Sequence, residues 1–275
     1  MLVTAFRKHP ANVIDACRRM YSRKQVVSYY ANFAALEKPE AAVLQALAGQ
    51  LGSMRMLDVG MGGGRVTEHV AWRVASYHGI DIAPEMVDTC RRRFAGRIPP
   101  ERFEVRDMRA LDGFRAHSFD FVLNAFNGID HLTHEERAVH LAQVRRVLAP
   151  GGLFCFSTHN IASLASYLQP TDWMQPAFWR RPRTALRTLQ RRGRFLRLNR
   201  DALAQYRAAD YVVINNGAHD DFGVQIYYVR TAAQLDALRC AGFGQIRVFS
   251  LDSGEQLTGG AIEAAEDRWL YFLCS

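Results

Sequence analysis

Residues 56–65 constrain the fold of this chain more than any other segment, and they read Met-Leu-Asp-Val-Gly-Met-Gly-Gly-Gly-Arg. The apolar residues around Asp58 predict a buried strand. Glycines at 60, 62 and 64 allow a sharp turn and let a ligand lie directly on the backbone, which a Cβ would prevent. A dinucleotide fingerprint would need another glycine where this chain has Arg65. The pattern therefore predicts a strand that leads into a nucleoside pocket without a phosphate site.

Polar residues follow the next predicted strands in the same way. A strand over residues 76–82 ends with Asp81, whose carboxylate can accept hydrogen bonds from both hydroxyls of a ribose. A strand over 102–108 ends with Asp107, which can accept from the exocyclic amine of adenine. Ile82 and Met108 would then lie on either side of that ring. Asp58, just before the turn, suits a cationic partner.

The pattern continues through two further strands. A strand over residues 119–123 ends at Asn124, and a helix is predicted from about residue 134 to 148. Ala149-Pro150-Gly151-Gly152 then leads into a strand over 153–157. Alternation of strands and helices at this spacing predicts a parallel sheet covered by helices.

Residues 54–158 resemble the class I S-adenosylmethionine-dependent methyltransferases, because the Asp-x-Gly-x-Gly-x-Gly turn, both later acids and the Pro-Gly-Gly segment occur in that family's order. Residues 231–274 resemble its last helix and closing antiparallel hairpin more loosely. The resemblance implies an α/β, Rossmann-like, seven-stranded sheet flanked by helices, mostly parallel with an antiparallel last strand. It also implies S-adenosylmethionine as cofactor. Met61 departs from the Cys of many relatives at a position that contributes mainly backbone.

The resemblance also implies which residues form the cofactor site. Two tyrosines that precede the core, Tyr29 and Tyr30, either close over the methionine end of the cofactor or simply pack there. The cofactor-binding residues expected are Asp58, Gly60, Gly62, Gly64, Asp81, Ile82, Met86, Asp107, Met108, Asn124, Tyr29 and Tyr30.

Three parts of the chain are predicted. Residues 1–52 form an N-terminal helical cap, residues 53–159 and 231–275 form the core, and residues 160–230 form an inserted lid. The first half of the lid is helical and rich in arginine. Its second half, with turn signals at 215–217 and 220–223, reads as a β-flap.

The net charge of +8 is concentrated in residues 180–200. Such a segment is either a solvated face, a site for an anionic substrate or a surface for a nucleic acid. The sequence Asn124-Ala125-Phe126-Asn127 lacks the Asn/Asp-Pro-Pro-Tyr/Phe motif of enzymes that methylate base amines. We therefore expect methylation of a small molecule on oxygen or nitrogen. The alternatives are an RNA or protein methyltransferase that uses the arginine-rich lid, and a cofactor-binding protein without catalysis.

Methyl transfer can require a base that removes a proton from the acceptor. His159 is the first candidate because the end of the fifth strand faces the transferred methyl in this fold, and His131 and His219 are the others. An ionised carboxylate or a neutral amine would need no base. The residues expected to contact the substrate are Asn127, Asp130, His131, His159, Asn160, His219 and Tyr228.

Other sequence features exclude some classes of protein. The five cysteines are scattered, so we expect reduced thiols, and no Cys or His cluster has the spacing of a metal site. No apolar run approaches the roughly 20 residues that cross a bilayer, and the N-terminus lacks a signal-peptide core. We expect a cytoplasmic protein that binds no metal.

Overall fold

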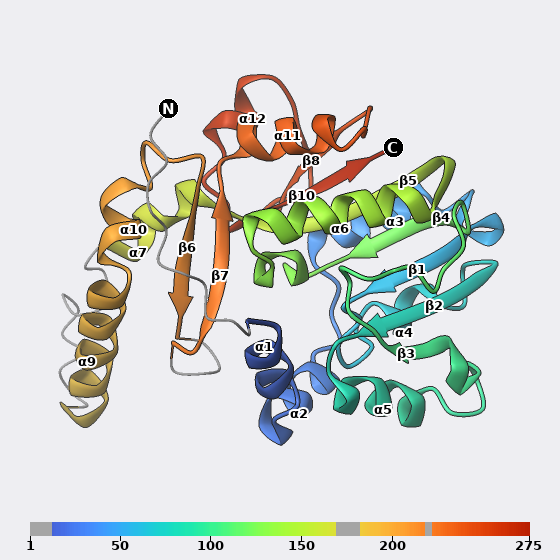
Figure 1. Cartoon of the computed structure of the whole chain (residues 1–275), viewed down its shortest axis with the longest axis horizontal. Helices are drawn as coiled ribbons and strands as arrows, with labels where there is room; N and C mark the ends of the chain where they lie inside the picture. Colours follow the sequence, from blue (N-terminus) through green and yellow to red (C-terminus); the bar gives the residue numbers. More distant parts are fainter. Residues whose placement is uncertain (1–12, 169–181, 218–221) are drawn as a thin grey trace.

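A single twisted sheet organises the computed structural model, which describes residues 13–168, 182–217 and 222–275 (Figure 1). Its strands run in the order β3-β2-β1-β4-β5-β10-β8-β9, and β6 and β7 extend it beside β5. The pairs from β3 to β5 are parallel, whereas β10 is antiparallel to β5 and β8. The strands are β1 Arg55–Val59, β2 Ser76–Asp81, β3 Phe103–Val105, β4 Phe119–Asn124, β5 Leu148–Asn160, β6 Tyr211–Asn216, β7 Val224–Val229, β8 Arg247–Ser250, β9 Gln256–Leu257 and β10 Trp269–Cys274.

The predicted α/β class and the mostly parallel sheet with an antiparallel last strand are confirmed. The sheet exceeds the seven predicted strands because the flap strands β6 and β7 and the short strand β9 join it. Strand β5 continues three residues past the predicted end at Ser157, and β7 pairs with this extension through His159 and Asn160. The antiparallel hairpin of β6 and β7 therefore belongs to the sheet and is not a detached cover.

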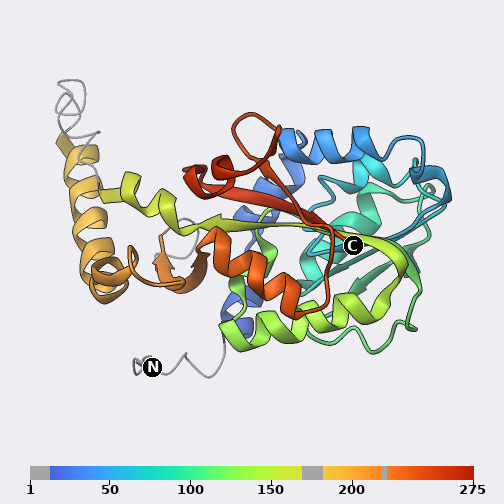
Figure 2. The same cartoon turned by 90° about the horizontal axis from the view of Figure 1, so that it is seen from above.

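Helices cover both faces of the sheet because the strand residues alternate between two apolar clusters. Met56 and Phe121 face α3, α4 and α5, whereas Leu57 and Val122 face α6 and α11. Figure 2 shows the blue helix α3 on the opposite side of the sheet from the lime α6 and the orange α11. Each such buried side chain contributes about 1.5–3 kcal/mol to folding. These helices are α3 Lys38–Ala46, α4 Thr67–Val70, α5 Pro84–Arg93, α6 His134–Val147 and α11 Thr231–Cys240.

The remaining helices and short turns lie at several places around the sheet. The N-terminal pair lies between the flap and α5 in Figure 1, while α9 stands at the far end of the molecule, beyond β6 (Figure 2). These elements are α1 Val13–Tyr21, α2 Lys24–Asn32, α7 Leu164–Leu168, α9 Pro182–Leu198, α10 Arg200–Gln205 and α12 Gly260–Ala264, with short 3-10 turns η1 Leu51–Ser53, η2 Pro100–Arg102, η3 Gly128–His131 and η4 Ile161–Ser163.

A buried ion pair ties the N-terminal helices to the glycine turn. The guanidinium of Arg65 binds both carboxylate oxygens of Glu40 on α3, and the hydroxyl of Tyr271 donates to the same carboxylate at 2.7 Å. The Arg65 guanidinium also lies 4.9 Å from the ring centroid of Phe126. Removing one partner of such a pair leaves a buried charge uncompensated, which typically costs about 3–5 kcal/mol.

Three simple properties of the described residues bear on the predicted class. No helix among residues 13–168, 182–217 and 222–275 is long and apolar enough to cross a membrane. Within the same ranges, no group of three or more His, Cys, Asp or Glu side chains could hold a metal ion. Each of the five cysteines is a free thiol, and only Cys240 is exposed.

Candidate functional site

A cleft opens at the carboxyl ends of β1 and β2, bounded by the glycine turn, α1, α2 and the turn after β4. We call it the main cleft; it encloses about 1000 Å³ of empty space, open solvent included. Gly60 and Gly62 adopt left-handed φ angles of 70° and 55°, which other residues rarely take. A Cβ on Gly62 would meet no protein atom within 4 Å. The backbone there is thus open to a ligand.

Asp81 is the acid at the floor of the main cleft. Its Oδ2 accepts the backbone N–H of Gly62 and its Oδ1 accepts that of Ala83, both at 2.9 Å. Burial raises the pKa of Asp81 to about 6, even though these backbone hydrogen bonds act in the opposite direction. The carboxylate lines the cleft, and a carboxylate has about four acceptor positions, so Asp81 retains acceptor capacity for a hydroxyl of a ligand.

Asp58 lies deeper, and its Oδ2 accepts the hydroxyl of Tyr77 at 2.8 Å. Burial raises the pKa of Asp58 to about 7, although the hydrogen bond from Tyr77 and the charge of Arg65 lower it. A nearby cation would restore the charged form. The group therefore suits a ligand ammonium or another cationic group at this end of the cleft.

Asp107 marks the other end of the main cleft, where Ile82, Met86 and Met108 supply apolar surface. Arg109 binds the Asp107 carboxylate at 2.6 Å. Burial would raise the pKa of Asp107, but the hydrogen bonds and charge of Arg109 hold it below its ordinary value. Asp107 thus stays ionised and can accept a hydrogen bond while this arginine fixes its orientation.

Three residues predicted to bind the cofactor do not line the main cleft. Gly64 faces Phe94 and Cys90, where a Cβ would come within 2.5 Å of the Phe94 ring. Asn124 is buried behind the turn and donates to the carbonyl oxygen of Val59 at 2.6 Å. Tyr29 is 52% exposed and points away, whereas its neighbour Tyr30 lies on the wall. Gly64 and Asn124 support the turn from behind.

A second cavity adjoins the main cleft, between α1, the end of β5 and the flap. We call it the side chamber; it encloses about 650 Å³ of empty space, open solvent included. Tyr21, Tyr30, Phe126 and His131 line both cavities and form their common wall. His159 lines the side chamber at the end of β5. The two cavities are therefore neighbours on either side of this wall.

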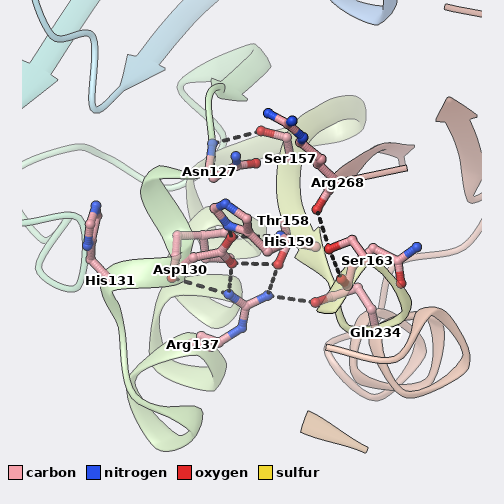
Figure 3. A network of polar contacts seen from close by, with 12 residues as sticks. Asn127, Asp130, His131, Arg137, Ser157, Thr158, His159, Ser163, Gln234 and Arg268 are labelled. Atoms are coloured by element: carbon pink, nitrogen blue, oxygen red, sulfur yellow. Dashed lines mark hydrogen bonds and ion pairs between the residues drawn. The ribbon is translucent and has the colours of Figure 1, made fainter. Parts of the chain in front are cut away.

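His159 is held by a buried carboxylate (Figure 3). Its Nδ1 and its backbone N–H both bind Oδ2 of Asp130, at 2.7 and 2.8 Å. The other oxygen, Oδ1, accepts from Arg137 at 2.7 Å and from the Thr158 hydroxyl at 2.5 Å. Burial would raise the pKa of Asp130, but the His159 hydrogen bond and the Arg137 charge hold it below its ordinary value.

This network changes the role expected of Asp130. Its side chain has no exposed surface and its Oδ2 accepts from the backbone N–H of His159, which places Asp130 behind His159 and away from the surface of the side chamber. Arg137 is fixed in turn by Gln234, whose Oε1 accepts at 2.7 Å, and by the Tyr227 ring, whose centroid lies 4.4 Å away. The sequence predicted Asp130 as a substrate residue, whereas in the structure it binds Thr158 and His159 of β5 and Arg137 of α6.

The other predicted substrate residues are placed as follows. Asn127 lies on the chamber wall, and Tyr228 packs against the His159 ring at 4.7 Å between centroids. Asn160 is a structural residue, since its amide accepts from the N–H of Ala162 and donates to the carbonyl of Ala265. His219 lies outside the described residues.

His131 lies in the common wall and its Nε2 is 2.7 Å from the Tyr21 hydroxyl. Some of its surface faces the cavities, yet burial lowers the pKa of His131 to about 4. The ring is therefore neutral near pH 7 and is a weaker proton acceptor than an ordinary histidine.

Sequence reasoning missed several wall residues. Tyr21 and Met20 come from α1, Trp269 begins β10, and Phe126 precedes Asn127 in a turn where both residues have positive φ, 54° and 62°. Positive φ at two successive residues other than glycine is uncommon and marks functional turns. No motif marks these residues in the sequence. Phe126 could have been found only from its position after a strand that ends in the cleft.

Comparisons with known proteins agree with this geometry. Residues 56–152 match a family model described as a methyltransferase domain. Over 105 residues the chain is 36% identical to a fatty-acid O-methyltransferase of Mycolicibacterium smegmatis, a match over 38% of this chain and 36% of that protein. Over 110 residues it is 31% identical to a ubiquinone biosynthesis O-methyltransferase of Xanthomonas oryzae pv. oryzae, covering 40% and 45% of the two chains. The match thus spans less than half the length of either relative.

Solved structures resemble almost the whole chain. The 1,6-didemethyltoxoflavin-N1-methyltransferase of Burkholderia thailandensis, solved with its substrate and S-adenosylhomocysteine, superposes with a TM-score of 0.58 at 15% identity, over 99% of this chain and 92% of that one. The CcbJ methyltransferase of Streptomyces caelestis superposes with a TM-score of 0.58 at 16% identity, over 93% and 97%. At such identities the likeness shows the fold.

Residues 56–152 thus match a methyltransferase domain, and the chain has the α/β fold of solved S-adenosylmethionine-dependent methyltransferases. The predicted fold and the predicted resemblance to methyltransferases are confirmed. The open backbone at Gly62 and the lone pairs of Asp81 fit the nucleoside of S-adenosylmethionine. Asp58 fits a cationic amino group, because a cation would compensate the burial that raises the pKa of this carboxyl to about 7.

Proposed function

We propose that the chain transfers a methyl group from S-adenosylmethionine to an oxygen or nitrogen of a small molecule held in the side chamber, with His159 as general base. The observation that carries the proposal is the common wall of the two cavities, beside which Asp130 holds His159. The O-methyltransferase relatives and the N1-methyltransferase structure support a small acceptor of this kind.

Asp130 prepares His159 for this role. Because the ionised carboxylate faces Nδ1, the neutral ring keeps its proton on Nδ1, and Nε2 has a free lone pair. The backbone hydrogen bond from His159 to the same oxygen fixes the ring further. Nε2 can then accept the acceptor's proton while the methyl group moves.

The cofactor supplies an electrophilic methyl on a sulfonium, and the protein has to align the nucleophile with it and exclude water. Tyr21, Tyr30 and Phe126 surround the point where the two cavities meet. The two tyrosine rings are tilted against each other with centroids 5.7 Å apart, and the Tyr30 and Phe126 rings pack edge to face with centroids 6.2 Å apart. This aromatic wall holds the reacting groups and lowers the local dielectric.

The parts of the chain receive matching roles in the proposal. Residues 1–52 act as a cap over the cofactor, residues 53–159 and 231–275 act as the catalytic core, and the insert at 160–230 closes the side chamber. Tyr30 from α2 and Ile226 from β7 support this division, since they line the cavities from the cap and from the insert. The proposed setting is the cytoplasm.

A His159→Gln variant tests the proposal. It keeps a polar side chain but removes the base, so we expect turnover to fall about 10²- to 10⁴-fold while S-adenosylhomocysteine affinity stays within about twofold. The matched control is His69→Gln on α4, which replaces a histidine outside both cavities. Full turnover by a folded His159→Gln enzyme would refute the assignment of the base.

A further inference from the structure

The side chamber is lined mainly by apolar and aromatic side chains. Met20, Val224 and Ile226 give aliphatic surface, while Phe126, Trp269 and the two tyrosines of the common wall give ring surface. The Phe126 and Trp269 rings meet edge to face at 5.8 Å, and Trp269 meets the His159 ring at 5.6 Å. Such walls favour a planar or otherwise apolar body, because aromatic surfaces gain from both burial and ring contacts.

The polar residues of this wall are uncharged or weakly basic. Besides Trp269 and the two tyrosines of the common wall, the polar side chains among the described residues that line the chamber are Asn127, Asn216, His131 and His159. The chamber thus offers neutral hydrogen-bonding groups and the lone pair on Nε2 of His159.

The nearest formal charges are already neutralised within the protein. The Asp130 carboxylate binds Arg137 at 2.7 Å, and Arg65 in the adjoining cleft binds Glu40 through both oxygens. No described arginine of α9 lines either cavity. These arginines had suggested an anionic substrate, but the described walls place no unpaired cation beside the acceptor.

The described protein walls would therefore give an ionised carboxylate no counter-ion for the hydration that it loses in the chamber, and burial without a protein counter-ion is unfavourable. An ionised carboxylate would also bring no proton to the lone pair on Nε2 of His159. A hydroxyl satisfies both requirements, because it enters uncharged and donates to that nitrogen. The Asp130–His159 arrangement is suited to an acceptor that still carries its proton.

We propose that the methyl acceptor is an uncharged hydroxyl compound with an aromatic or apolar body, in the manner of a phenol, and not a carboxylate. The inference rests on the proposed function. In the step, the acceptor oxygen forms the bond to the methyl carbon as the carbon–sulfur bond breaks. The sulfur keeps the bonding electron pair, and the hydroxyl proton passes to Nε2 of His159.

The first test compares 2-naphthol with 2-naphthoate, which share a ring body and differ in charge at pH 7 because a phenol keeps its proton and a carboxylic acid does not. Calorimetric titration uses the enzyme saturated with S-adenosylhomocysteine, which lacks the sulfonium charge, so the result reports the protein walls alone. We expect 2-naphthol to bind at least about tenfold more tightly. Equal affinities, preference for 2-naphthoate or binding of neither probe would overturn the inference.

The second test adds a positive charge to the side chamber, which should shift the binding preference from 2-naphthol toward 2-naphthoate. Asn216 at the end of β6 lines the chamber and is half-buried, so Asn216→Lys introduces a cation there. We expect this variant to bind 2-naphthoate at least about tenfold more tightly than the wild type does. The matched control Asn216→Met fills similar space without charge and should leave the ratio of the two affinities unchanged. A shift of equal size in both variants would contradict the charge argument.

Turnover assays separate this inference from the proposed function. Tight binding of 2-naphthol without methyl transfer to it or to other hydroxyl compounds would count against catalysis and leave the selectivity for uncharged acceptors standing. Methyl transfer to 2-naphthoate in preference to 2-naphthol would support the proposed methyltransferase activity and refute the proposed class of acceptor.

Discussion

Replacing Asp81 by alanine separates binding from stability in the main cleft. The carboxylate would accept two ribose hydroxyls, and it already accepts the N–H groups of Gly62 and Ala83 at 2.9 Å. A lost hydrogen bond to a charged group costs about 1.5–3 kcal/mol, which corresponds to about a 10- to 150-fold loss of affinity. We expect Asp81→Ala to weaken S-adenosylhomocysteine binding by at least this factor.

The stability of the unliganded variant should change much less. Burial raises the pKa of Asp81 to about 6 from an ordinary value of 3.8, so the folded state binds its proton more tightly than the unfolded state does. Between those pH values the Asp81 contribution to the free energy of unfolding therefore falls as the pH rises, by up to about 3 kcal/mol. Asp81→Ala removes the cost of burying the ionised carboxylate, but it also removes the hydrogen bonds from Gly62 and Ala83. We expect these two changes in the free energy of unfolding largely to cancel.

Calorimetry and thermal unfolding measure the two quantities. Wild-type affinity for S-adenosylhomocysteine should rise with pH up to about 6 and then level off, because hydroxyl donors favour the ionised carboxylate, whereas Asp81→Ala should lack that rise. The control is Asp112→Ala, which removes an exposed acid outside the cleft. A folded Asp81→Ala variant with wild-type affinity and the same pH dependence would show that Asp81 does not contact the cofactor.

Three further predictions address other contacts. Gly63→Ala should lower the free energy of unfolding by about 1–3 kcal/mol, because the added Cβ would lie 2.7 Å from the backbone of Ala31 on α2. Denaturant titration measures this change, and unchanged stability would refute the predicted clash. Asp130→Asn should lower the free energy of unfolding by about 3–5 kcal/mol, because the buried guanidinium of Arg137 loses its counter-ion. Adding Arg137→Gln to this variant should restore part of the lost stability. Arg183→Gln with Arg187→Gln should leave KM for the acceptor within about twofold; a large rise would show that α9 binds the substrate.

The residues of the main cleft could be predicted from the sequence because they follow strand ends at short spacing along the chain. Gly60, Gly62 and Asp81 lie at the ends of adjacent parallel strands, so spacing along the chain places them together. The acceptor side was less readable. Asp130 looked like a free acid because nothing near it in sequence shows that Arg137 and Thr158 bind it.

The end of β5 shows the same limitation. Thr158, His159 and Asn160 are polar and predict a loop, yet they continue the strand because β7 and β10 pair with them on either side. Asn160 is polar for another reason, since its amide caps the following turn and holds the Ala265 carbonyl. Tyr21 could not be assigned to the wall from sequence, because its place depends on how α1 packs against η3.

The continuous strand β5 also determines which side of the chamber can open. Its last two residues, His159 and Asn160, pair with β7 of the flap, and these pairs would break if the flap swung away. The N-terminal helices have no such ladder, and side chains such as Arg93, which donates to the carbonyl of Ala31 at 3.3 Å, hold them instead. We therefore expect the rate at which α1 and α2 move away from the sheet to set the rates of acceptor entry and product release. The contacts that hold these two helices would then determine those rates.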